Sequence, residues 1–86
     1  MFELLITATF AKELKKLQRH EIERIKEKLK STQENPMLFF EGLKGTELYK
    51  LRVGKFRILA TINFREKTIT MHSLGLRKNV YDRLQK

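Results

Sequence analysis

The sequence predicts a single α+β domain over residues 1–86, in which helices pack on one face of an antiparallel sheet. The first observation is that apolar residues recur every three or four positions up to Leu29, the period of an amphipathic helix. The second is that they recur at every second position from Tyr49 onward, the period of a half-buried strand. The third is the length, since a chain of 86 residues buries only ~60–65% of its extended surface and so forms one modest core.

The N-terminal part of the chain predicts a strand followed by a helical region. Phe2 to Thr7 is mostly apolar and rich in β-forming residues, which is typical of a short strand buried on both faces. Thr9 fits the N-cap of a helix that begins at Phe10. The apolar stripe of the helical region comprises Phe10, Leu14, Leu17, Ile22, Ile25 and Leu29. No Gly or Pro interrupts this stripe, so the sequence permits either one long helix or a helical hairpin.

A connector follows the helical region. Asn35-Pro36 ends the helix, because the residue before a proline is pushed out of the α region. Four apolar side chains of the connector are expected to fill the edge of the core: Leu38, Phe39, Phe40 and Leu43.

The second half of the chain predicts a three-stranded antiparallel meander packed against the helices. The first two strands meet at a tight turn, Gly54-Lys55, and a polar turn at residues 65–67 leads to the third. Gly75 is expected to break the third strand. Asn79 to Leu84 then predicts a short terminal helix or an extended tail.

The net charge of +9 is unevenly distributed along the chain. Residues 1–43 hold eight Lys or Arg and seven Asp or Glu, a net charge of +1. Residues 44–86 hold eleven Lys or Arg and three Asp or Glu, a net charge of +8. Such asymmetry indicates a polyanionic partner, which could be nucleic acid, anionic lipid or a strongly acidic protein. The alternative is a basic surface that only aids solubility.

Side-chain alternation predicts where these charges gather. Lys50 and Arg52 lie two residues apart on one strand and point to the same face, spaced like successive backbone phosphates. Arg57 joins them if the hairpin register puts it on that face, and a slip of one residue would bury arginines. A guanidinium is a planar fork that can hold a phosphate through two hydrogen bonds. The alternative is the solvated face of an ordinary half-buried sheet.

Composition excludes several classes of site. There is no cysteine, which removes disulfide scaffolds, zinc–thiolate sites and thiol nucleophiles. His20 and His72 are the only histidines, too few for a zinc site; His20 is expected to be exposed, and a role for His72 stays open. The start of the chain lacks the basic region and cleavage site of a signal peptide, and no apolar run spans a bilayer. The simplest interpretation is a cytoplasmic protein.

The order and spacing of these segments resemble the RelE/ParE superfamily of toxin–antitoxin toxins over nearly the whole chain, and more closely its RelE branch. The resemblance begins at the first strand and the start of the helix. It is most specific in the run from Leu48 to Gly54, in Phe56-Arg57-Ile58 and in the segment from Gly75 to Tyr81.

The resemblance implies an endoribonuclease that enters the ribosomal A site and cleaves messenger RNA. It implies no metal or other cofactor, because the substrate's own 2′-hydroxyl attacks and leaves a 2′,3′-cyclic phosphate. Five positions match catalytic positions of the family: Lys50, Arg52, Arg57, Arg77 and Tyr81. Further RNA-binding candidates are Lys44, Lys55 and Lys78.

The resemblance also assigns roles to the five positions. Lys50 and Arg52 act on the nucleophile and the phosphate, Arg57 stabilises the added negative charge, Arg77 lies beside the leaving oxygen, and Tyr81 stacks on a base. Because arginine does not readily release a proton, the general base would be Lys50, whose neutral form neighbouring cations favour.

Two positions depart from the family pattern. Position 76 is Leu where many relatives carry a basic residue, and Arg52 occupies the second possible base position, so that Lys50 would act alone. The implied partners are the ribosome, its messenger RNA and a RelB-like antitoxin with an acidic or amphipathic helical segment. Two alternatives are a ParE-like inhibitor of DNA gyrase and a non-catalytic module that binds RNA or the antitoxin.

Overall fold

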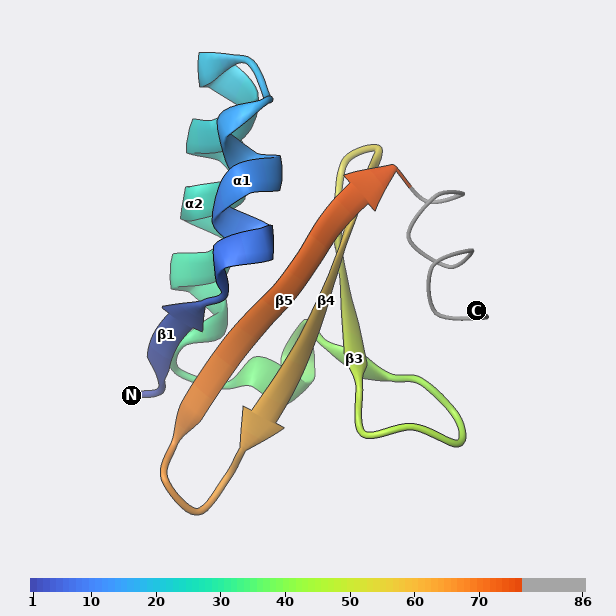
Figure 1. The fold of residues 1–86 in the computed structure, drawn as a ribbon. Coiled ribbons are helices and arrows are strands. Elements are labelled where there is room, and N and C mark those ends of the chain that lie inside the picture. The colour runs from blue at the N-terminus through green and yellow to red at the C-terminus, as the bar shows by residue number, and fades with distance from the viewer. Residues whose placement is uncertain (77–86) are drawn as a thin grey trace.

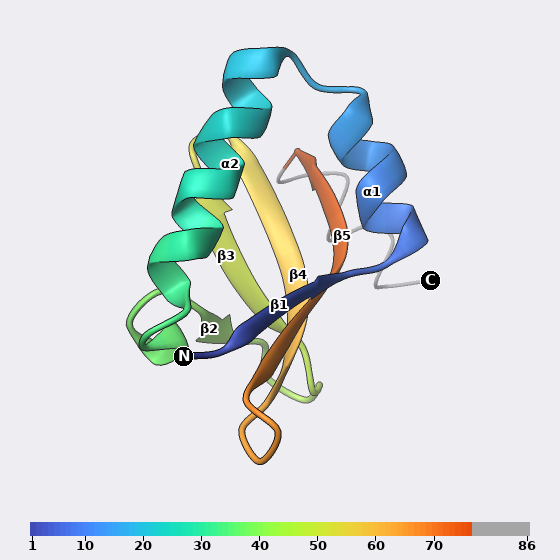
Figure 2. The same ribbon diagram turned by 90° about the vertical axis from the view of Figure 1, so that its left-hand side faces the viewer.

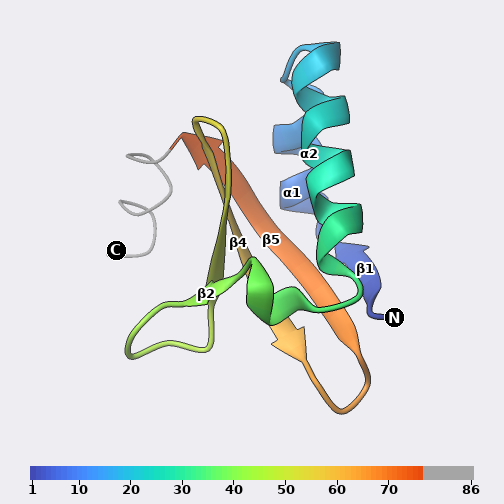
Figure 3. The same cartoon turned by 180° about the vertical axis from the view of Figure 1, so that it is seen from behind.

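The computed structural model describes residues 1–76 and forms two layers, with two helices packed on one face of a sheet (Figure 1). The elements in chain order are β1 (Glu3–Ile6), α1 (Ala8–Lys15), α2 (Arg19–Thr32), the 3₁₀ helix η1 (Pro36–Leu38), β2 (Glu41–Gly42), β3 (Tyr49–Val53), β4 (Phe56–Asn63) and β5 (Thr68–Leu76). This confirms the predicted α+β class, with the helices on one side of the sheet when the molecule is seen from behind (Figure 3).

Within residues 1–76 the sheet has five strands in the order β1-β5-β4-β3-β2. The antiparallel meander β3-β4-β5 is confirmed. β1 pairs with β5 in parallel, so the first strand of the chain lies beside the last one described (Figure 2). β2 was not predicted, because two residues are too few to show a period of two; it pairs with β3 through Glu41 opposite Lys50 and Gly42 opposite Tyr49.

The helical region is a hairpin rather than one long helix (Figure 2). The α1 helix ends at Lys15, and α2 begins after Gln18, whose backbone N–H donates to the Glu21 carboxylate at 3.0 Å. A glutamate at this position satisfies one of the free N–H groups at a helix start. None of the helices among residues 1–76 is long and apolar enough to cross a membrane.

The predicted N-cap at Thr9 is wrong, because the helix begins earlier. Thr7 is the N-cap of α1, and its hydroxyl accepts a hydrogen bond from the Phe10 backbone N–H at 3.1 Å. The same hydroxyl donates to the backbone oxygen of His72 on β5 at 3.0 Å. Thr7 therefore ties the start of α1 to the sheet, a tertiary contact that local sequence does not reveal.

The hydrophobic core lies between the helix pair and the sheet. Its largest fully buried apolar side chains come from both layers: Phe10, Ile25, Leu51, Ile58, Ile69 and Met71. Burying a side chain of this size contributes about 1.5–3 kcal/mol relative to leaving it exposed. Every second residue of β3 and β4 points into this core. The residues between them therefore point to the opposite face of the sheet.

Three predictions about burial are wrong. β1 is not buried on both faces, since Leu5 and Ile6 are 42% and 52% exposed; it is an edge strand with a neighbour on one side only. Of the connector residues, Phe40 joins the core, whereas Leu38 is 74% exposed on the short η1 helix. The apolar alternation from Tyr49 onward also predicts burial of Phe64, which instead lies beyond the end of β4 and is exposed.

Gly75 does not break the last strand, as the sequence suggested. β5 continues to Leu76, and Gly75 pairs with Arg57. The irregularity lies earlier, where Leu59 pairs with Ser73 but Ala60 pairs with Met71, which leaves His72 as an extra residue in β5. The predicted terminal helix or tail at Asn79–Leu84 lies outside the described residues.

Glu13 of α1 accepts a hydrogen bond from a part of β5 that β1 is too short to pair with. The pairing of β1 with β5 stops at Ile6 and Met71, so further residues of β5 lack a neighbouring strand on that side. The Leu74 backbone N–H donates instead to the Glu13 carboxylate at 2.9 Å. A buried backbone donor needs such a partner, and a charged acceptor makes the hydrogen bond stronger.

We expect Glu13→Ala to lower the free energy of unfolding by about 1–3 kcal/mol, because the Leu74 N–H then loses its charged acceptor. Glu13→Gln keeps an acceptor oxygen and should lose less. Urea unfolding followed by circular dichroism measures both values. Equal stability of the alanine variant and the original protein would show that this bond contributes nothing.

Candidate functional site

The hairpin formed by β3 and β4 brings three cationic residues together. Arg52 pairs directly with Arg57, and Lys50 lies two residues from Arg52 on the same strand. The intervening residues of β3 and β4, among them Leu51 and Ile58, face the core beneath the helices. The three cations therefore share the face that points away from the helices, as alternation predicted, and the register does not slip.

Arg57 is the most unusual of the three because it is buried. It lies on the central strand β4 and is only 7% exposed, so the far face of the sheet is not open at this point as the sequence suggested. Its guanidinium donates to the Phe56 backbone oxygen at 3.2 Å. Within residues 1–76, no carboxylate lies within ion-pair distance of Arg57.

Two arginines directly opposite each other on paired strands repel, and a buried charge without a counter-ion is unfavourable. Arg52 is exposed and likewise has no carboxylate within ion-pair distance in residues 1–76. Two such guanidinium groups are able to bind an anion, and a phosphate group matches the fork of each.

Lys50 has a partner that the sequence did not suggest. Glu41 pairs with it across β2 and β3, and its carboxylate lies 3.5 Å from the Lys50 ammonium. The Lys50 side chain is 25% exposed and that of Glu41 is 64% exposed, so the pair is accessible at the edge of the site. Glu41 was missed because the two-residue strand that places it leaves no periodic signal.

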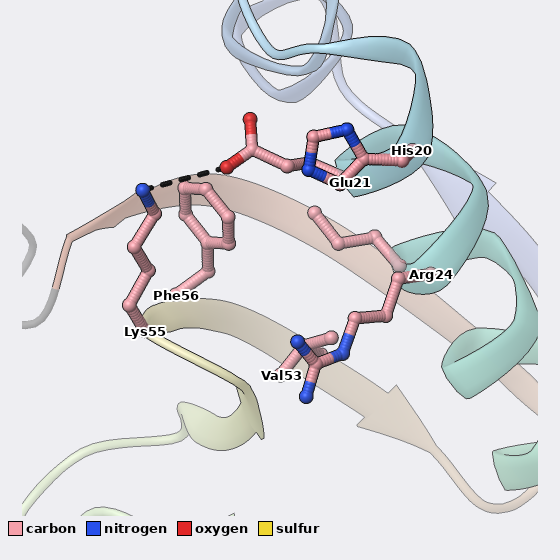
Figure 4. A pocket seen from close by; sticks show the side chains of 7 residues that line it. His20, Glu21, Arg24, Val53, Lys55 and Phe56 are labelled. Carbon is pink, nitrogen blue, oxygen red and sulfur yellow. Dashed lines mark ion pairs between the residues drawn. The ribbon is translucent and has the colours of Figure 1, made fainter.

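Two further RNA-binding candidates, Lys44 and Lys55, lie outside β3 and β4. Lys44 lies in the exposed loop before β3, and Lys55 lies in the turn after it, at the opposite end of the strand. Lys55 turns toward α2, where its ammonium lies 3.4 Å from the Glu21 carboxylate (Figure 4). Arg77, Lys78 and Tyr81 lie outside the described residues.

Glu21 holds together the contact between α2 and the turn of the β3–β4 hairpin. The pKa of its carboxyl lies below the ordinary value of 4.5. The main cause is the hydrogen bond from the Gln18 backbone N–H, and the interaction with Lys55 lowers the pKa further. Its side chain lines a hollow of about 300 Å³ together with Arg24, Lys55 and Phe56 (Figure 4).

His72 lies apart from the three cations, farther along the same sheet. Its Nε2 atom is 2.8 Å from the Thr61 hydroxyl, so the imidazole has a structural partner. His20 is exposed, as predicted. Within residues 1–76, no group of three or more His, Asp or Glu side chains is arranged to hold a metal ion.

A strand, a helical hairpin and an antiparallel sheet with Arg52 opposite Arg57 on its far face define a small toxin of the RelE/ParE type. The chain matches the family model of the ParE toxin of type II toxin–antitoxin system, parDE, over residues 4–81, and it belongs to that family. No curated protein matches the chain.

Solved structures of related toxins have the same fold. The RelB–RelE complex of Methanococcus jannaschii contains a chain 31% identical, with a TM-score of 0.72 over 92% of this chain and 96% of that one. The Pyrococcus horikoshii RelE–RelB complex contains a chain 25% identical, with a TM-score of 0.77 over 88% of this chain and 94% of that one. The RelBE2 complex of Mycobacterium tuberculosis, at 19% identity, supports the fold alone, with a TM-score of 0.82 over 88% of this chain and 98% of that one.

We expect Glu21→Gln to destabilise the protein at neutral pH and to change its acid sensitivity. Because folding lowers the pKa of this carboxyl, its contribution to stability is fully present above pH 4.5 and is lost as the pH falls through the lower, folded-state pKa. The stability difference between the two proteins should therefore shrink below about pH 4.5. Urea unfolding at a series of pH values measures it.

The matched control is Glu23→Gln on the same helix, which removes an exposed ion pair with Arg19. Such pairs contribute little, so this variant should follow the original protein at every pH. A Glu21→Gln difference that stayed constant with pH would contradict the assignment.

Proposed function

We propose that this toxin is a ribosome-dependent endoribonuclease that cleaves messenger RNA in the A site. The observation that carries the proposal is the buried Arg57 directly opposite Arg52, with no carboxylate at ion-pair distance from either in residues 1–76. An arrangement that disfavours folding is explained if it serves an anionic ligand.

The proposed reaction needs cations more than it needs an elaborate acid–base system. The 2′-oxygen of the RNA attacks the adjacent phosphorus, the bond to the 5′-oxygen breaks, and a 2′,3′-cyclic phosphate remains. Negative charge builds up on the non-bridging oxygens in the transition state. A fixed guanidinium aimed at this charge stabilises it, and removal of one such donor typically costs about 2.7–4 kcal/mol. Arg57 suits this role because burial strengthens its field and its neighbours hold it in place.

Lys50 is the proposed general base, and its ion pair with Glu41 bears on that role. A base must reach the 2′-hydroxyl of the substrate, whereas the Lys50 ammonium is held by the Glu41 carboxylate at 3.5 Å. RNA binding would therefore have to break this ion pair before Lys50 could act on the substrate. Orientation of the RNA by the ribosome supplies a large part of the remaining acceleration.

Two further roles fall on residues outside the described part of the chain. By resemblance, Arg77 would stabilise the leaving 5′-oxygen and Tyr81 would stack on a base of the substrate. Stacking on an aromatic ring is a usual way in which proteins hold single-stranded RNA.

A RelB-like antitoxin is the proposed protein partner. The related toxins of Methanococcus jannaschii and Pyrococcus horikoshii were solved as complexes with RelB. An acidic segment of the antitoxin would complement the net charge of +9 and would associate quickly.

A second candidate function is inhibition of DNA gyrase, which the match to the ParE family model favours. The two functions leave different traces in cells. Induction of an RNA-cleaving toxin yields transcripts cut within translated codons, whereas a gyrase inhibitor yields DNA breaks or supercoiling defects with transcripts intact. The second pattern would reject the ribonuclease proposal.

We expect Arg57→Gln to slow cleavage of messenger RNA on programmed ribosomes by about 10²–10³-fold, because the transition state loses a fixed positive charge. The rate of appearance of 2′,3′-cyclic phosphate ends measures the effect. Glutamine keeps a hydrogen-bond donor and much of the side-chain length, so the fold should be retained, as a thermal unfolding scan can verify.

Arg65→Gln is the matched control, since it removes the same charge from an exposed turn beyond β4. It should cleave like the original protein. If Arg57→Gln also retained the full rate while remaining folded, Arg57 would have no part in the chemistry.

A further inference from the structure

A groove runs along the seam between α2 and β3. Three hollows of about 300, 270 and 390 Å³ lie along this seam. The first and second share Arg24 and Val53 in their walls, and the second and third share Lys28 and Arg52. Because neighbouring hollows share wall residues, the three lie next to one another in a row, called here the seam groove; Figure 4 shows its first part.

Five cations line the seam groove: Lys55, Arg24, Lys28, Arg52 and Lys50. The two at its ends are paired with carboxylates, Lys55 with Glu21 and Lys50 with Glu41. Glu27 also lines the middle hollow. No carboxylate among residues 1–76, Glu27 included, lies within ion-pair distance of Arg24, Lys28 or Arg52. The middle of the groove is therefore its unneutralised part.

The positions of these side chains are set by the fold. Arg24 and Lys28 are four residues apart on α2, so they point to the same face of the helix. The Arg24 guanidinium lies over the hairpin turn, where a Cβ added at Gly54 would be 3.0 Å from its Nη1 atom. The Lys28 ammonium lies 5.1 Å from the centre of the Phe39 ring. Arg24 and Lys28 thus lie along the wall of the groove that faces β3.

We propose that the seam groove binds the phosphodiester backbone of the RNA that flanks the cleavage site, an inference that rests on the proposed function. Arg52 and Lys50 belong both to the proposed site and to the groove, so the two surfaces are continuous. A strand whose phosphate lies at Arg52 and Arg57 must leave that site, and the groove offers its next phosphates a row of cations. Exposed arginine and lysine side chains that follow a groove are the usual means of holding single-stranded nucleic acid.

The test compares two charge-matched double variants of the full-length toxin. Arg24→Gln with Lys28→Gln removes two groove cations, whereas Lys26→Gln with Lys30→Gln removes two exposed cations of the same helix that line none of the three hollows. The probe is a fluorescent single-stranded oligoribonucleotide with a 2′-deoxy substitution at the cleavage site. Its dissociation constant is measured over a series of salt concentrations.

The groove variant should bind more weakly at low salt. The slope of its log affinity against log salt should be shallower by about 0.7 for each phosphate that the variant no longer neutralises. The control variant should keep the original slope. Equal slopes for the two variants would overturn the inference, because the effect would then reflect net charge alone. So would unchanged RNA binding by the groove variant combined with weaker binding of a polyglutamate peptide, since the groove would then serve an acidic protein.

The outcomes also separate this inference from the proposed function. If the groove variant keeps the original salt dependence while Arg57→Gln loses cleavage, the groove proposal fails and the ribonuclease proposal stands. If the groove variant shows the shallower slope while Arg57→Gln cleaves normally, RNA binding in the groove stands and the catalytic assignment fails.

Discussion

The register of the β3–β4 hairpin is the constraint on which the site depends. It places Arg52 opposite Arg57, and like charges directly opposite each other on paired strands are destabilising. The same register buries Leu51, Val53, Phe56 and Ile58 against the helices. Each of these side chains contributes about 1.5–3 kcal/mol by burial, so the apolar face stabilises this register. Burial of the apolar side chains therefore keeps Arg52 and Arg57 opposite each other, although their charges repel.

The helical hairpin serves the site indirectly. It covers the face of the sheet that carries the apolar residues, which leaves the other face to the charges (Figure 1). Three contacts hold it in position. Thr7 and Glu13 bind backbone groups of β5 near the extra residue at position 72, and Glu21 binds Lys55 in the hairpin turn. Because Leu74 pairs with Ile58 of β4, and the turn joins β4 to β3, these contacts lie beside the part of the hairpin that carries the arginines.

Sequence reasoning succeeded where a residue's position follows from local periodicity. Alternation put Lys50, Arg52 and Arg57 on one face, and the structure places them there. It failed where tertiary contacts decide. The break between α1 and α2 depends on the capping contact between Gln18 and Glu21, in a stretch with no Gly or Pro. Glu41 reaches Lys50 from a strand of two residues, and side-chain alternation does not predict the burial of Arg57.

The charge distribution along the chain is also a poor guide to the charge distribution in space. Residues 1–43 carry a net charge of only +1, which pointed away from the helices as a binding surface. A helix separates its residues by face, however, so a nearly neutral segment can present a cationic stripe. Arg24 and Lys28 do this: they line the seam groove with Arg52, whereas Lys26 and Lys30 of the same helix line none of its hollows. The second half of the chain supplies the two arginines, and the first half supplies the cations that extend their field, so the surface offered to a polyanion is wider than the sequence asymmetry indicated.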